Sequence, residues 1–314
     1  MAMAFPRGDG PPPAECRIRG HGQVGLRPAD RGKATRRSLG GTRRRRGEAA
    51  RGTKDASWRE TLGDLDSSFE SGGVRTREEA TTSGKLCVLR DDSSHPTPYE
   101  SAWEEQKRLV SSKCLQLERG QVLTQDLLLV QHEAVYTLGA GSTTDHLLFD
   151  EEDPPLPLFR TERGGEVTYH GPGQLVLYPV MDLRSFEQDL HWYMRTLEEV
   201  VIRTLGALGL EGERVEGLTG VWVEGKKVAA IGVRAKRWIT YHGLALNVTT
   251  DLSPFENIVP CGIQDRGVTS VYDLLAGAKG GEKGLDKDAL LKDVATELLN
   301  SFEELFGVEY CLVD

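Results

Sequence analysis

The sequence has few cysteines, no pair of them at metal-binding spacing, and no long apolar run. Its five cysteines (Cys16, Cys87, Cys114, Cys261 and Cys311) are odd in number and form no CxxC pair. This argues against a disulfide scaffold or a zinc site and favours a reducing compartment. No run of 18 or more apolar residues is present, and no apolar segment follows the N-terminus. We therefore expect no bound metal, no membrane span and no secretory signal.

Aliphatic residues are sparse over residues 1–82, where Gly, Pro and Arg dominate. Residues 1–60 hold 15 Lys and Arg against 6 Asp and Glu, while residues 61–314 hold 24 against 42. Residues 1–82, the basic leader, can bury too little apolar surface to offset the conformational entropy that folding would cost them. An Arg-rich segment poor in acids favours an organelle transit peptide, the alternatives being a disordered tail or a mistaken upstream extension of the gene. The acidic remainder, 83–314, argues against non-specific nucleic-acid binding.

The folded part, 83–314, mixes helical and strand patterns. Apolar residues at helical spacing predict three helices, at Tyr99–Ser112, Asp189–Leu208 (ending at Gly209) and Asp286–Leu305. Short apolar runs predict strands at Lys85–Arg90, Asp126–Gln131, Gln174–Val180, Gly220–Val223, Lys227–Arg234 and Leu244–Val248. Glu224-Gly225-Lys226 reads as a hairpin turn. We therefore expect an α/β (α+β) domain on a mixed sheet, and not a doubly wound parallel one.

Two segments combine glycines with polar side chains beside strands. Arg163–Gln174 (RGGEVTYHGPGQ) holds four glycines and a histidine between two apolar runs. In Gly220–Val248 the small residues Ala229, Ala230 and Gly232 interrupt a strand, and His242-Gly243 predicts a bend. Glycine within a strand often marks close approach of a ligand or of another backbone. The first segment also fits a structural turn with a hydrogen-bonded histidine. Lys226 and Lys227, which precede the strand of the second segment, also fit a solvated surface.

A third segment, Ile258–Gly262 (IVPCG), places a cysteine between proline and glycine. A free cysteine is most often a small buried hydrophobe. Cys261 instead falls on a turn or loop, where a thiol of lowered pKa acts as a nucleophile. The other four cysteines lack this setting.

Together the three segments resemble the lipoyl(octanoyl) transferase family over roughly Lys85–Leu275. RGG-x-x-TYHGPGQ, KVAAIG followed by HGLALNV, and the PCG turn occur in the family's order, with a texture similar to the plant and algal plastid forms. The resemblance implies a biotin/lipoate protein ligase-like catalytic domain. This sequence departs from the family in its basic leader and in the loop Glu151–Pro157.

The resemblance also implies roles for particular residues. Cys261 would carry the acyl group as a thioester, Lys227 would lower the pKa of that thiol, and His170 is expected to orient the thioester or a water molecule. Lys226 would lie on the opposite strand face from Lys227. The implied substrate-binding residues are Arg163, Gly164, Gly165, Glu166, Val167, Thr168, Tyr169, His170, Ala230, Ile231, Gly232, Gly243, Leu244 and Ala245.

The implied reaction moves an octanoyl group from octanoyl-acyl carrier protein to a lysine of a lipoyl domain, the first step of endogenous protein lipoylation. The implied acceptors are the 2-oxoacid dehydrogenase E2 subunits and the glycine cleavage H protein. No cofactor is expected. Arg234, Lys236 and Arg237 are candidates for docking the acidic carrier. The resemblance favours the plastid (chloroplast stroma), with the mitochondrion as the alternative.

Three other functions stay open at this point. An ATP-dependent lipoate or biotin ligase on the same fold would not need Cys261. A cysteine thioesterase would use His170 or His242 to activate water on the acyl-enzyme. An inactive homologue would bind lipoyl domains without transferring anything, against which the intact Cys261 and Lys227 argue.

Overall fold

The structure is a computed structural model that describes residues 17–18, 85–259, 266–278 and 284–312. Its main element is a mixed sheet in which nine described strands run in the order β1-β12-β2-β3-β7-β11-β10-β9-β8. These strands are Arg17–Ile18, Glu309–Leu312, Leu86–Thr97, Gln125–His132, Gln174–Val180, Ile239–Asn247, Lys226–Lys236, Leu218–Val223 and Glu213–Val215. Strand β2 is parallel to both of its neighbours, and the remaining pairs are antiparallel.

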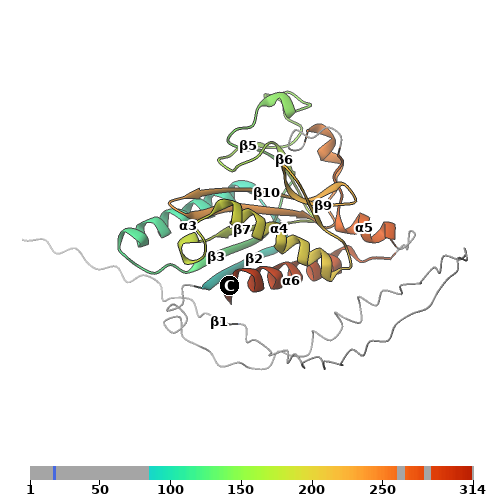
Figure 1. Ribbon diagram of the computed structural model, residues 1–314. Coiled ribbons are helices and arrows are strands. Elements are labelled where there is room, and N and C mark those ends of the chain that lie inside the picture. The colour runs from blue at the N-terminus through green and yellow to red at the C-terminus, as the bar shows by residue number, and fades with distance from the viewer. Residues whose placement is uncertain (1–16, 19–84, 260–265, 279–283, 313–314) are drawn as a thin grey trace, which may run out of the picture. The chain divides into compact units, whose positions relative to one another are not determined.

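A second, smaller sheet has the order β5-β4-β6, with β4 at Val135–Leu138, β5 at Leu158–Arg160 and β6 at Thr168–His170. It lies above the large sheet in the view of Figure 1. Short 3-10 turns occur at Thr144–His146, Leu183–Ser185 and Ser253–Asn257.

Helices cover both faces of the large sheet. Helices α4 (Leu190–Ala207) and α6 (Lys287–Phe306) pack against each other, and with α5 (Val271–Ala278) they contribute to one apolar core. Helix α3 (Tyr99–Glu118) covers the other face (Figure 1). No described helix is long and apolar enough to cross a membrane.

Strand β7 shows why this layered arrangement forms. Successive side chains of a strand point to opposite faces. Leu175 and Leu177 accordingly join the core under α4 and α6, while Val176 and Tyr178 join the core under α3. All seven residues of β7 are buried, as the continuous apolar run predicts for a central strand covered on both sides.

Most of the predicted elements are confirmed, with differences at their ends. The Glu224-Gly225 turn has φ of 51° and 74°, as a type I′ hairpin turn requires, and Gly209 follows α4 with a φ of 76°. Strand β2 and helix α3 both continue well beyond their predicted ends. Strand β11 begins at Ile239 rather than at Leu244. His242 has a φ of 57° but still pairs with β10, so the predicted bend does not interrupt the strand.

Candidate active site

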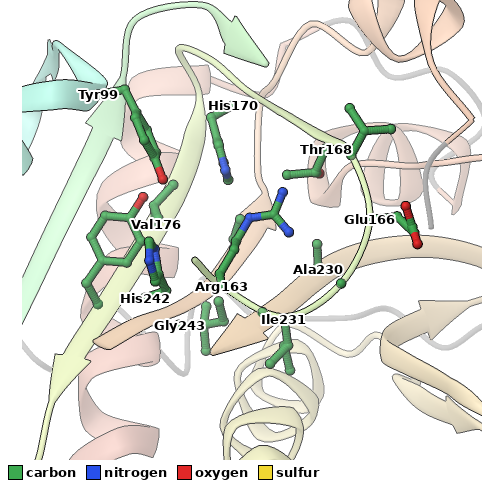
Figure 2. Close-up of a pocket in the computed structure, with 16 residues that line it drawn as sticks. Tyr99, Arg163, Glu166, Thr168, His170, Val176, Ala230, Ile231, His242 and Gly243 are labelled. Carbon is green, nitrogen blue, oxygen red and sulfur yellow. The ribbon is translucent and has the colours of Figure 1, made fainter. Parts of the chain in front are cut away.

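A pocket opens between the small sheet and strands β7, β10 and β11. Its empty space is about 480 Å³, its open mouth included. It is lined by Tyr99, Arg163, Gly165, Glu166, Val167, Thr168, His170, Val176, Tyr178, Ala230, Ile231, Gly232, His242, Gly243, Leu244 and Ala245 (Figure 2). All but two of the fourteen residues expected to bind substrate therefore line one cavity, although the motifs that carry them lie far apart in sequence.

The two exceptions help to hold the wall. Gly164 donates its backbone N–H to the carbonyl oxygen of Val233 at 3.0 Å, which ties the loop to β10. Tyr169 points into a separate apolar cluster, where its ring meets that of Phe255 edge-on. The predicted substrate-binding stretch thus contains both lining and supporting residues.

Glycines let the loop approach its neighbours closely. A Cβ on Gly232 would lie 2.8 Å from the carbonyl oxygen of Gly164, and a Cβ on Gly139 would lie 1.8 Å from that of Gly165. Neither position has room for a side chain. The glycine within strand β10 therefore marks close approach of another backbone, which is one of the two readings that the sequence allowed.

Arg163 brings a buried cation into the pocket. Its guanidinium donates to the carbonyl oxygen of Thr137 at 2.7 Å, to Thr137 Oγ1 at 2.9 Å and to the carbonyl oxygen of Gly164 at 3.0 Å. Figure 2 shows it extending among Thr168, His170 and Ala230. These bonds fix the guanidinium in one orientation in the wall of the pocket.

His170 is fixed in one tautomer. Its Nδ1 donates to Gln174 Oε1 at 2.7 Å, because the Gln174 amide nitrogen is already donating to Tyr169 and Asn247. Its Nε2 lies 3.4 Å from Thr137 Oγ1, from which it accepts. Burial first, and then the neighbouring His132, hold the pKa of His170 well below its usual value. His170 is therefore a neutral, oriented ring in the pocket wall.

His132 lies behind the pocket wall, in contact with two residues that line the pocket, Tyr178 and His170. His132 donates from Nδ1 to the carbonyl oxygen of Thr97 at 3.1 Å and accepts at Nε2 from the Tyr178 hydroxyl at 2.8 Å. Its ring meets that of His170 at 5.7 Å, and Tyr99 stacks on His170 at 6.0 Å. The rings of Tyr99 and His132 thus both pack against the ring of His170.

Replacing His132 with glutamine is expected to make folding less sensitive to acid. Burial lowers the pKa of His132 to about 4, whereas histidine in an unfolded chain titrates near about 6.5. Between these values the unfolded state binds a proton that the folded state does not. The free energy of unfolding therefore falls as the pH drops from about 6.5 to about 4, by about 3 kcal/mol for this group.

Urea unfolding between about pH 7.5 and about pH 4 measures this slope. The variant loses buried hydrogen bonds and is less stable throughout, so the slope and not the level is compared. His191→Gln on the exposed start of α4 is the matched control and should keep the wild-type slope. An equal slope in His132→Gln would contradict the expectation.

Lys227 lies in a second cavity beside the first. The two cavities share Thr168, Ala230 and Ala245 in their walls. Lys227 is 6 % exposed, whereas Lys226 is exposed to solvent. The sequence predicted that only one of the two lysines faces the site, and Lys227 is the one that lines the cavity.

The chain on both sides of residues 260–265 returns to this region. The N–H of Lys227 donates to the carbonyl oxygen of Gly267 at 3.0 Å, and the N–H of Val259 donates to that of His146 at 2.8 Å. His146 in turn lies 3.1 Å from Glu166, which lines the pocket. Cys261 itself lies outside the described residues.

Sequence reasoning missed four lining residues, Tyr99, Val176, Tyr178 and His242. Val176 and Tyr178 alternate along β7, so the strand period offered a signal for them. His242 was noted for its bend and for the thioesterase alternative, but not as a residue that binds substrate. It is fully buried, neither ring nitrogen has a hydrogen-bond partner, and Nε2 lies 3.8 Å from Glu162. Among the described residues, no group of three or more His, Cys, Asp or Glu side chains could hold a metal ion.

Comparison with known proteins identifies the family to which this chain is similar. The family model of the lipoyl protein ligase A/B catalytic domain matches residues 99–303. A chloroplastic octanoyltransferase of Arabidopsis thaliana is 49% identical over 230 residues, covering 73% of this chain and 81% of the relative. An octanoyltransferase of Synechocystis sp. is 56% identical over 180 residues, covering 57% and 78%.

Two solved structures share the fold. A putative lipoate protein ligase of T. acidophilum with bound lipoic acid aligns with a TM-score of 0.51 at 16% identity, over 73% of this chain and 88% of that one. Lipoate-protein ligase A bound with ATP aligns with a TM-score of 0.52 at 17% identity, over 73% and 89%. The catalytic-domain architecture predicted from the sequence is therefore confirmed.

Proposed function

This chain belongs to the lipoyl protein ligase A/B family and, within it, to the octanoyltransferases, which are acyltransferases; from this premise we propose its donor, its acceptor and its covalent intermediate. The donor is octanoyl-acyl carrier protein, the acceptor is a specific lysine of a lipoyl domain, and Cys261 carries the octanoyl group between them as a thioester. The observation that carries the proposal is one cavity walled by the motifs of the family, with buried Lys227 beside it.

In the first step, the Cys261 thiolate attacks the carbonyl carbon of the octanoyl thioester. The bond from that carbon to the carrier sulfur then breaks. The leaving thiolate takes a proton from the Lys227 ammonium, so the carrier departs as a thiol. The step exchanges one thioester for another and is nearly isoenergetic, which suits a reversible loading reaction.

In the second step, the neutral amine of the acceptor lysine attacks the Cys261 thioester. Neutral Lys227 takes the proton that the amine loses, and the Cys261 thiolate leaves. The amide product makes this step downhill, and the enzyme regains its thiolate and its ammonium. One proton on Lys227 therefore serves both halves of the cycle.

The cavity wall supplies the remaining groups. Each tetrahedral intermediate carries an oxyanion, which the Arg163 guanidinium and backbone N–H groups of the glycine loop would stabilise. His170 is neutral, and its Nε2 can only accept, so it would orient the thioester by contact with its ring or by holding a water molecule that donates to Nε2. The apolar side chains of Val176, Ile231 and Leu244 would contact the acyl chain, each buried CH₂ contributing about 0.8 kcal/mol.

We infer the partners of this enzyme from the chemistry of the reaction, and its location from its relatives. The acceptors we propose are the lipoyl domains of the 2-oxoacid dehydrogenase E2 subunits and the glycine cleavage H protein. The carrier is acidic, and Arg234 and Lys236 are exposed on β10 as candidates for docking it. The relatives in a chloroplast and in cyanobacteria support the plastid. Residues 1–82, nearly all outside the described residues, would be the transit peptide and 83–314 the catalytic domain.

Incubation of the purified chain with octanoyl-acyl carrier protein tests the proposal. Intact mass should rise by one octanoyl group, and hydroxylamine should remove it. Apo lipoyl domain added next should receive the group on a lysine. If the chain stays unmodified while ATP and free octanoate label the lipoyl domain, the ligase alternative takes its place. Release of free octanoate without any acceptor would support a thioesterase instead.

A further inference from the structure

Gly220 leaves the space that the end of the Lys227 side chain occupies. A Cβ on Gly220 would lie 2.7 Å from Cε and 3.3 Å from Nζ of Lys227. It would also lie 2.6 Å from the carbonyl oxygen of Ala229. The backbone of Gly220 has a φ of 125°, which side-chain-bearing residues rarely adopt. A side chain at this position would therefore push the ammonium out of its present place.

Glu198 of helix α4 holds the backbone of Gly220. Its Oε1 accepts from the N–H of Gly220 at 3.1 Å, and its Oε2 accepts from Arg195 at 2.7 Å and Arg214 at 3.0 Å. The Glu198 side chain is only 2% exposed. A buried carboxylate is retained at this depth only where donors satisfy it, and here one donor is the glycine that faces Lys227.

Trp222 borders the lysine on the neighbouring strand. It is the cross-strand partner of Lys227 in the β9–β10 pair, and Lys227 Nζ lies 5.4 Å from its ring centroid. The ladder shifts register between Lys227 and Ala229, directly after this pair. An aromatic ring at this distance attracts the ammonium. The register shift, the Trp222 ring and Gly220 thus all lie next to the Lys227 side chain.

We propose that Glu198, Gly220 and Trp222 form a seat that fixes the Lys227 ammonium where the transfer reaction needs it, with Gly220 as a positioning residue. The proposal rests on the function proposed above, in which Lys227 favours the thiolate of Cys261. The attraction between two charges falls with their separation, so a displaced ammonium stabilises the thiolate less.

Gly220→Ala should therefore move the pH dependence of transfer. We expect the octanoylation rate at about pH 7 to fall roughly 10- to 100-fold and its half-maximum to move to higher pH, with partial recovery of the rate at high pH. Gly217→Ala is the matched control. Gly217 also has a positive φ, of 77°, but nothing lies within 4 Å of its would-be Cβ, so this variant carries the backbone strain without the clash.

A double-mutant cycle separates positioning from general damage. In a Lys227→Ala background, Gly220→Ala should have little further effect on rate or pH profile, because the side chain it displaces is gone. An equal loss of transfer rate from Gly220→Ala in the wild-type and Lys227→Ala backgrounds would overturn the proposal. If Lys227→Ala itself leaves the pH profile unchanged, the proposed role of Lys227 fails, and the two failures are thereby distinguished.

Glu198 supplies a second test should Gly220→Ala fail to fold. Glu198→Ala removes the acceptor of the Gly220 N–H and should move the half-maximum in the same direction as Gly220→Ala. Arg195→Ala is its control, because it leaves the Glu198 carboxylate on Gly220 and Arg214, and it should retain the wild-type pH profile. Equal profiles in Glu198→Ala and Arg195→Ala would contradict the proposal.

Discussion

Cys261→Ser is expected to remove the octanoyl adduct and to lower transfer to a lipoyl domain by roughly 10³-fold or more, because the nucleophile that we propose is itself replaced. Serine keeps the size of the side chain, but its hydroxyl is not ionised near neutral pH, so no comparable anion attacks the thioester. Intact mass after reaction with octanoyl-acyl carrier protein measures the adduct, and a gel or mass assay of the acceptor measures transfer.

The buried cysteines supply controls for this experiment. Burial raises the pKa of the Cys87 thiol well above its usual value. Cys114 is a residue of helix α3 and is buried in the apolar core beneath that helix. Both behave as small hydrophobes. Cys87→Ala and Cys114→Ala should therefore keep the adduct, with some loss of stability. An adduct that survives in Cys261→Ser and disappears in either control would show that the nucleophile lies elsewhere.

Lys227→Ala should give the second largest loss, about 10²- to 10⁴-fold in transfer to the acceptor, since in the proposed mechanism it removes both the cation that favours the thiolate and the base for the incoming amine. Without the ammonium, the pKa of the Cys261 thiol should rise toward the ordinary value of about 8.5. Alkylation of that thiol by iodoacetamide as a function of pH reports the change directly.

The neighbouring lysine makes a close control. Lys226 precedes Lys227 but is exposed on the turn side of β10. Lys226→Ala has the same change of charge and the same loss of side chain, and it should leave both the alkylation profile and the transfer rate near wild type. Comparable losses in the two variants would mean that net charge, and not the buried position, is what matters.

The sequence predicted six of the nine described strands of the large sheet, because those six carry apolar runs, and it missed the short strands β1, β8 and β12. β7 begins and ends at the predicted residues, Gln174 and Val180. The small sheet was not predicted, since β5 and β6 have three residues each and the glycine-rich segment around β6 reads as a loop. Periodicity needs more residues than these strands contain.

The candidate site was predictable where motifs are local and not where they depend on packing. Arg163, Ala230 and Gly243 belong to motifs that the sequence displays, and the structure brings them to one cavity. Tyr99 enters from the start of helix α3, and its presence in the wall follows from how that helix packs on the sheet. Burial of Lys227 rather than Lys226 likewise depends on the local register of β9 and β10.

The glycine contacts of the pocket also determine how the enzyme could be redesigned. At Gly139, Gly232 and Gly243, an added carbon would lie 1.8, 2.8 and 2.1 Å from a backbone carbonyl oxygen. Substitutions there would deform the chain before they reshaped the cavity. Under the proposed function, a protein engineer who wants a longer or shorter acyl chain is left with the apolar side chains, above all Val176, Ile231 and Leu244. We expect substitutions at those positions to change acyl selectivity while the glycine framework stays constant.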